Sequence, residues 1–304
     1  MTKTTHQTTF IKRVDKFFQF FGMSVTLIGL FVLLILLWDV MHDGLTRIDY
    51  QFLTSYPSRK PAQAGILAAW VGTIWIMVLT ALISIPVGIA SAIYLEEYAK
   101  KSKLANFIEI NIANLAGVPS VIYGILGLGL FVRWMQLDRS VLAGSLTLSL
   151  LILPVIILST REALKTVPFS IREAAFALGA TKWQAVRYQV LPAAFANILT
   201  GIILALSRAV GETAPLIMIG ALTYIPFLPT NPVSISKEPP FVHFTLQGLI
   251  DPFTVLPIQI FNWVSRPQKG FIACAAGGII VLLIITLIMN AMAIYLRMKN
   301  QKRW

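Results

Sequence analysis

Arg208 and Glu212 are the residues most able to do chemistry, because they interrupt an otherwise apolar run, SRAVGETAPLIMIGA. Four positions separate them, which places both on one face if the run is helical. Charges inside a membrane segment are costly and usually face protein or a water-filled cavity. An arginine fork suits a tetrahedral oxyanion, and Thr213 adds a hydroxyl donor. The pattern predicts an anion pathway in which Glu212 holds Arg208 until the anion arrives; an ion pair that only joins helices is the alternative.

The composition shows what kind of protein must position this pair. The chain has 304 residues, 57% of them hydrophobic and 12% charged, which is typical of polytopic membrane proteins. The net charge of +12 accompanies no basic-aromatic patch, so it indicates membrane topology and not nucleic-acid binding. One cysteine, Cys274, and three scattered histidines offer no metal-ligand spacing.

Hydropathy predicts an all-α polytopic membrane protein with about six transmembrane helices, because spanning backbone must satisfy its own hydrogen bonds. The spans are expected at Phe20–Met41, Ile66–Leu95, Asn106–Val132, Leu142–Thr160, Ile198–Leu222 and Phe271–Leu296. The third span opens with a more polar stretch and is expected to begin as an interfacial segment. Three of the spans contain prolines that can kink them, namely Pro86, Pro119 and Pro154.

The distribution of lysine and arginine predicts the topology. Segments 1–17, 96–105, 161–195 and 297–304 together hold sixteen basic residues, whereas the longer segments 42–65, 133–140 and 221–270 hold eight. Basic residues concentrate on the cytoplasmic side, so both termini and the segment 161–195 are expected to be cytoplasmic. An even number of spans, such as six, satisfies this arrangement.

The external segment 221–270 contains eight of the sixteen prolines. This density argues against a folded helical domain, and we expect a rigid, extended excursion over the pore mouth. Within it, the short apolar run 256–264 predicts a membrane-surface helix.

The cytoplasmic segment 168–192 is predicted to form two short helices. Ser170 is the expected N-cap of the first helix, with Glu173 completing a capping box. Gly179 is expected to end this helix at positive φ. A second helix over 182–190 follows, and Pro192 is expected to restart the chain toward the fifth span. An exposed helix of small apolar residues can insert into a partner's groove, whereas a hairpin resting on the membrane without a partner is the alternative.

The same segment resembles the coupling loop of ABC import permeases. The motif E-A-A-x3-G-x11-L-P falls on Glu173, Ala174, Ala175, Gly179, Leu191 and Pro192. Further strings of this kind are PVGIASAIYLEEYA (86–99), GVPSVIYG (117–124) and PFSIREAAFALGATKWQ (168–184). The string GETAPL (211–216) resembles the A-type subunit of the phosphate-specific branch.

The resemblance implies a type I importer permease whose coupling loop docks on an ATPase. Its partners would be a sister permease in a heterodimer, two ATPase subunits and an external phosphate-binding protein, all at the bacterial cytoplasmic membrane. This chain would bind no cofactor and have no enzymatic activity, because ATP and Mg²⁺ belong to the ATPase and no G-x4-G-K-[ST] loop occurs here.

Four segments follow from the spans and the resemblance. They are a cytoplasmic N-terminal tail (1–19), a first span with its external loop (20–65), the permease domain (66–296) and a cytoplasmic C-terminal tail (297–304).

Two alternatives stay open. A permease of the same class could carry sulfate, molybdate or phosphonate, because one arginine does not choose among oxyanions. An ion-coupled secondary transporter would need several acids within its spans. Beside Glu212 the spans offer only Asp39 and Glu109, both near span ends.

Overall fold

The computed structural model describes residues 3–99, 102–230, 233–235, 242–244 and 247–300. Nearly all of these residues are helical, and the exceptions include one short antiparallel hairpin. The α-helices are α1 (Lys3–Leu45), α2 (Tyr50–Thr54), α3 (Leu67–Ile93), α4 (Lys103–Ala116), α5 (Ser120–Gly127), α6 (Val141–Lys165), α7 (Phe169–Ala177), α8 (Lys182–Ala185), α9 (Leu191–Gly211), α10 (Ala214–Ile219), α11 (Leu256–Val264) and α12 (Gly270–Asn300). Three π-helical turns are η2 (Tyr94–Tyr98), η3 (Leu128–Trp134) and η4 (Val186–Val190); the 3-10 turns are η1 (Pro61–Gln63) and η5 (Gln247–Leu249); the strands are β1 (Val233–Ile235) and β2 (Val242–Phe244).

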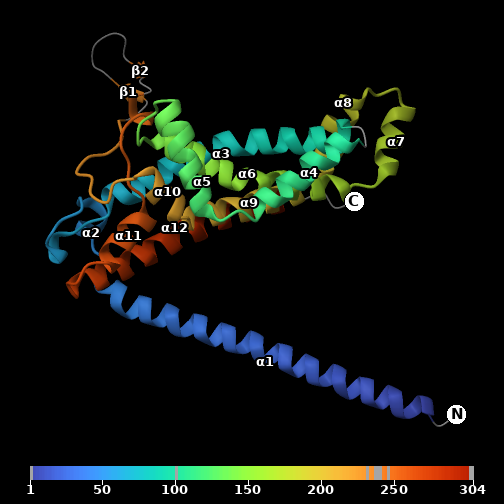
Figure 1. The fold of residues 1–304 in the computed structure, drawn as a ribbon, viewed down its shortest axis with the longest axis horizontal. Coiled ribbons are helices and arrows are strands. Elements are labelled where there is room, and N and C mark those ends of the chain that lie inside the picture. The colour runs from blue at the N-terminus through green and yellow to red at the C-terminus, as the bar shows by residue number, and fades with distance from the viewer. Residues whose placement is uncertain (1–2, 100–101, 231–232, 236–241, 245–246, 301–304) are drawn as a thin grey trace.

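The predicted all-α polytopic fold is confirmed. Within the described residues, five helices are long and apolar enough to cross a membrane, and the count reaches six if the bent pair of α4 and α5–η3 is one broken span and not a re-entrant loop. The start of α1 and the pair α7–α8 lie at one end of the molecule's long axis, and α2 lies at the other (Figure 1). Residues 301–304 of the predicted C-terminal tail, and Pro232, Pro239 and Pro240 of the external loop, lie outside the described residues.

The third predicted span is a bent pair and not one continuous helix. α4 and α5–η3 meet at an angle of 104°. Gly117 caps α4, and Pro119 precedes the first residue of α5. Proline disfavours helical backbone in the residue before it, which explains a break at this point. Pro86 and Pro154, by contrast, remain inside the continuous helices α3 and α6.

A layer of buried hydroxyls joins α3 to α6 at the centre of the fold. The Thr80 hydroxyl donates to the carbonyl of Ser145 at 3.3 Å, and the Ser149 hydroxyl donates to the carbonyl of Thr80 at 3.4 Å. Small residues let the two backbones approach, and interhelical hydrogen bonds then hold them together. Apolar side chains such as Ile152 and Ile156, both fully buried, continue the same interface. The two helices therefore form one packed unit.

Gly127 is expected to be essential for folding, because a Cβ atom there would collide with the hydroxyl of Thr147 on α6. We expect Gly127→Val to lower the amount of protein in the membrane severalfold, since overpacking costs about 1–3 kcal/mol. Gly129→Val is the matched control, because nothing lies within 4 Å of a Cβ at Gly129. Membrane abundance measured by immunoblot tests both variants, and equal loss in the two would contradict this reading of the packing.

The external segment differs from the extended excursion that its prolines predicted. It contains the β1–β2 hairpin and α11, which packs against α12 (Figure 1). The predicted short helix is present, and its membrane-surface placement stays a prediction. Phe261 and Val264 are exposed on one side of α11, whereas Leu256 and Trp263 are fully buried in the protein core. The amide of Leu256 also donates to the hydroxyl of Thr73 on α3 at 2.9 Å. Contacts from distant helices thus decide where this short apolar run lies.

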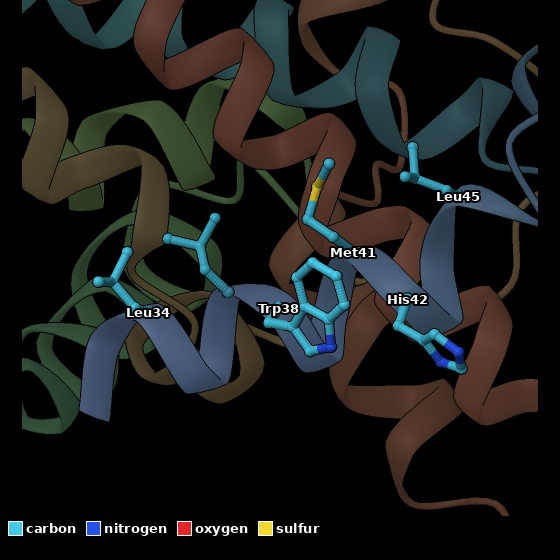
Figure 2. A pocket seen from close by; sticks show the side chains of 6 residues that line it. Leu34, Trp38, Met41, His42 and Leu45 are labelled. Carbon is cyan, nitrogen blue, oxygen red and sulfur yellow. The ribbon is translucent and has the colours of Figure 1, made fainter. Parts of the chain in front are cut away.

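The first helix stands apart from the rest of the molecule (Figure 1). None of the most apolar part of its span, which covers Val14–Leu45, is buried within the chain. Its C-terminal end approaches α12, where a Cβ on Gly44 would collide with the backbone of Ala276. An apolar hollow of about 400 Å³ follows α1 (Figure 2), lined by Leu34, Leu37, Trp38, Met41, His42 and Leu45. The hollow contains none of the predicted site residues.

Candidate transport site and coupling surface

A single helical rod joins the two predicted sites. α8, η4 and α9 run without interruption from Lys182 to Gly211, over 30 residues. Pro192 lies within the first turn of α9, where the predicted restart toward the fifth span places it, but the helical backbone continues into α9 from η4 without a break. Leu191 and Pro192 are both half-buried in this rod. Pro192 and Arg208 are sixteen residues apart in this rod. At a helical rise of about 1.5 Å per residue, they lie about 24 Å apart, which is most of the thickness of a bilayer core.

Arg208 and Glu212 lie at the end of this rod and not in the middle of a longer helix. Arg208 is in the last turn of α9, and Glu212 is its C-cap with extended backbone (φ −75°, ψ 117°). The predicted fifth span to Leu222 is therefore divided, with α10 following after Thr213. Pro215 explains the division, because its ring would clash with the carbonyl of Gly211 in a continued helix.

The structure confirms contact between the two charged groups. Nε of Arg208 lies 3.3 Å from Oε1 of Glu212. The Arg208 side chain is 45% exposed, and that of Glu212 is 17% exposed. One carboxylate thus engages one edge of the guanidinium, while much of the arginine fork stays accessible. The guanidinium can bind an incoming oxyanion by donating hydrogen bonds from its remaining N–H groups.

The surroundings of Arg208 hold it in place. On the preceding residue, the Ser207 hydroxyl donates to Oδ1 of Asn290 on α12 at 2.6 Å. Thr213 is half-buried at the break between α9 and α10. α10 in turn packs closely on α5, where a Cβ on Gly124 would meet the backbone of Pro215. The site therefore sits where three helices meet, on a rigid base.

The predicted helix–Gly–helix shape of residues 168–192, the coupling segment, is present with one correction. α7 begins at Phe169 after the N-cap Pro168, so Ser170 lies inside the first turn and forms no capping box with Glu173. The capping box occurs instead at α8, between Thr181 and Gln184. A side chain can act as N-cap only at the residue before the helix, and the helix already begins at Phe169, two residues too early for Ser170.

Gly179 has φ +81°, the left-handed conformation that was predicted for it. This conformation favours glycine because a Cβ atom would crowd the following carbonyl oxygen.

The coupling segment exposes much of its surface. Glu173 and Ala174 are exposed, as is Gly179, whereas Ala175 is buried beneath them. Large apolar side chains are also exposed here, namely Phe169, Phe176, Leu178, Trp183 and Tyr188. A groove of about 420 Å³ lies between the two short helices, lined by Ala175, Leu178, Gly179, Ala180, Gln184, Ala185, Tyr188 and Gln189. An apolar groove with a polar edge is a surface suited to receiving a partner.

The sequence analysis did not predict a group of ion pairs that join α6 and α7 to η2 and α4, next to the coupling segment. Arg161 at the end of α6 binds Glu96 at 3.3 Å and Glu109 of α4 at 2.8 Å. Arg172 of α7 binds Glu97 at 2.7 Å. The sequence signal was the accumulation of charges just beyond the ends of apolar runs, but sequence alone does not pair residues that lie 65 or 75 positions apart.

In the part of the chain that the structure describes, no group of three or more His, Cys, Asp or Glu side chains is close enough together to hold a metal ion.

Comparison with known proteins gives the family. The family model "Binding-protein-dependent transport system inner membrane component" matches residues 84–299. A probable ABC transporter permease, YqgI of Bacillus subtilis, is 31% identical over 278 residues, covering 90% of each chain. A phosphate transport system permease, PstA of Yersinia pestis, is 32% identical over 273 residues, covering 90% of this chain and 86% of that one.

A solved structure shows the same fold. An inward-facing MetNI methionine ABC transporter chain gives a TM-score of 0.56 at 17% identity, over 76% of this chain and 92% of that one. Together with the apolar helices described above, these findings place the protein in the inner membrane as a multi-pass component. The chain belongs to the family of binding-protein-dependent transport system inner membrane components, the permease subunits of ABC importers.

Proposed function

We propose that this chain forms half of the translocation path for inorganic phosphate in an ATP-driven importer of the bacterial cytoplasmic membrane. The observation that carries the proposal is the continuous rod from Lys182 to Gly211, which ends at the partly open Arg208 and begins at the exposed coupling segment. The relatives named as phosphate transport permeases, at 29% to 32% identity, support phosphate as the cargo.

The partners follow from this arrangement. A sister permease would supply the other half of the path, and an external phosphate-binding protein would deliver the anion. Two ATPase subunits would bind ATP and Mg²⁺, so this chain needs no cofactor and catalyses no reaction itself. The exposed apolar groove of the coupling segment is the surface that we assign to the ATPase.

The site's chemistry suits a transient anion. Phosphate can accept N–H bonds from the open edges of the Arg208 guanidinium, and Glu212 keeps that guanidinium oriented when no anion is present. Thr213 adds a hydroxyl at the same helix break. Because Glu212 offsets part of the positive charge, the anion is not held so tightly that it cannot leave.

The orientation in the membrane is part of the proposal. The start of α1 lies at the same end of the long axis as α7 and α8 (Figure 1), which supports a shared cytoplasmic side. The excess of basic residues in segments 1–17 and 161–195 points to that side as well. Both termini would then be cytoplasmic.

Uptake by the whole complex tests the function. The chain, its sister permease, the ATPase and the binding protein are reconstituted in proteoliposomes, and labelled phosphate uptake is measured with and without ATP. We expect ATP-dependent uptake that excess unlabelled phosphate abolishes. If sulfate, molybdate or phosphonate competes as well as phosphate, the cargo is another oxyanion; uptake driven by an ion gradient without ATP would contradict the importer assignment.

Leu178 is expected to contribute to ATPase docking, because its side chain is 91% exposed at the edge of the groove. Replacing it with serine should weaken retention of the ATPase about tenfold, since burying a leucine side chain contributes about 1.5–3 kcal/mol. Leu104→Ser is the matched control, because Leu104 is 68% exposed on α4, away from the groove. Co-purification of the ATPase measures the effect, and unchanged retention in Leu178→Ser would contradict docking at this groove.

A further inference from the structure

Three consecutive residues at the end of α3 each contact a basic residue from a different element. The residues are Glu96, Glu97 and Tyr98, and they belong to the π-helical turn η2. The contacts are Glu96–Arg161 of α6 at 3.3 Å, Glu97–Arg172 of α7 at 2.7 Å, and the Tyr98 ring centre with Nζ of Lys182 of α8 at 5.1 Å. Both short helices of the coupling segment are therefore attached to one turn of α3.

The pair of Glu97 and Arg172 is the most enclosed of these contacts. Their side chains are 8% and 11% exposed. Arg172 also donates to the carbonyls of Val167 at 2.9 Å and Leu164 at 3.1 Å, beside the end of α6. One guanidinium thus holds α7 against both α6 and α3. Breaking a buried pair of this kind leaves an unpaired charge and is strongly unfavourable.

The covalent chain does not make this connection to α3. The coupling segment continues directly from α6 and into α9, whereas α3 is reached only through side chains. π-helical turns interrupt regular helix geometry and occur often at functional positions. The contacts of Arg172 and Lys182 give α7 and α8 a direct connection to the turn η2, in addition to the route through α6, which packs along α3.

We infer that Glu97 and Arg172 are positioning residues that transmit movement of the coupling segment to α3 and the pore helices packed on it. The inference rests on the proposed function, because it requires that an ATPase moves the coupling segment. The pair acts at the cytoplasmic end of α3 and contacts neither the transported anion nor ATP.

The test measures phosphate transported per ATP hydrolysed in the reconstituted complex. We expect Glu97→Ala and Arg172→Ala each to lower this ratio about tenfold, with membrane abundance and ATPase co-purification kept within about twofold of wild type. The double variant should be no worse than Arg172→Ala alone, because both substitutions break one contact. Glu97→Gln, which keeps an acceptor oxygen, should give an intermediate ratio and retains the fold if Glu97→Ala does not.

Glu162→Ala is the matched control. Its carboxylate pairs with Lys165 at 2.8 Å at the same end of α6, but the side chain is 71% exposed and this ion pair lies within α6, joining it to neither α3 nor α7. This variant should keep the wild-type ratio.

Two results would overturn the inference. The first is a wild-type ratio of phosphate transported per ATP hydrolysed in both Glu97→Ala and Glu97→Gln. The second is a loss of uptake in proportion to the loss of bound ATPase, with that ratio unchanged, which would mean that the pair only helps the complex to assemble. Failure of the proposed function is distinguishable, because the wild-type complex would then show no ATP-driven phosphate uptake at all.

Discussion

Arg208→Gln is expected to lower ATP-driven phosphate uptake about 100-fold while the complex still assembles. A hydrogen bond to a charged group contributes about 1.5–3 kcal/mol, and losing about 2.8 kcal/mol corresponds to two orders of magnitude. Glutamine is shorter than arginine, but the Arg208 side chain is 45% exposed, so the packing of α9 should change little. Uptake by proteoliposomes, normalised to the amount of permease, measures the effect.

Two further variants separate an anion-binding role from a purely structural one. Arg208→Lys keeps the charge and loses the planar fork, so an intermediate loss of about tenfold is expected. Glu212→Gln should keep more uptake than Arg208→Gln, because it leaves the guanidinium in place. Arg133→Gln, at an exposed arginine in the last turn of η3, is the control for loss of a positive charge. Wild-type uptake in Arg208→Gln would reduce the pair to an ion pair that joins helices.

Gly179→Val is expected to lower phosphate uptake about thirtyfold through the backbone of the coupling segment. The residue has φ +81°, and nothing lies within 4 Å of a Cβ placed there. Any effect must therefore come from backbone strain and not from a collision. Left-handed backbone costs a branched residue about 2 kcal/mol, which a change in the angle between α7 and α8 would relieve. Uptake and ATPase co-purification, each normalised to membrane abundance, provide the measurement.

Gly179→Asn is the matched variant, because asparagine tolerates the left-handed region better than other residues with a side chain. It should keep most of the uptake that Gly179→Val loses. If valine and asparagine have equal effects, the exposed surface at this position matters and the backbone conformation does not. If neither changes uptake, the turn at Gly179 has no part in coupling.

Local features of the sequence were enough to predict several elements. Spans recur wherever about 20 apolar residues follow one another, because each span is decided by its own transfer free energy. Gly179 was placed correctly at positive φ because only glycine adopts that conformation without strain. The charge count assigns the loops to two sides of the membrane without knowledge of any contact, and this assignment stays a prediction.

Other local signals were present in the sequence and were interpreted wrongly. Pro215 lies four residues after Gly211 and ends α9 there, so the helix that was expected to contain Glu212 stops just before it. Pro168 similarly moved the start of α7 ahead of Ser170. In both cases the proline outweighed an apolar or capping pattern, because its ring excludes backbone conformations that the pattern would need.

The sequence by itself determined that this protein is a polytopic membrane permease with an exposed coupling segment and a charged pair in its fifth span. Only the tertiary structure decided that one face of α11 is buried, and that Arg172 meets Glu97 across 75 positions. The reason is physical. Hydropathy and helix breaks depend on residues that are close together in the sequence, whereas ion pairs and burial depend on which helices pack together. The connection between the coupling segment and α3 belongs to this second kind.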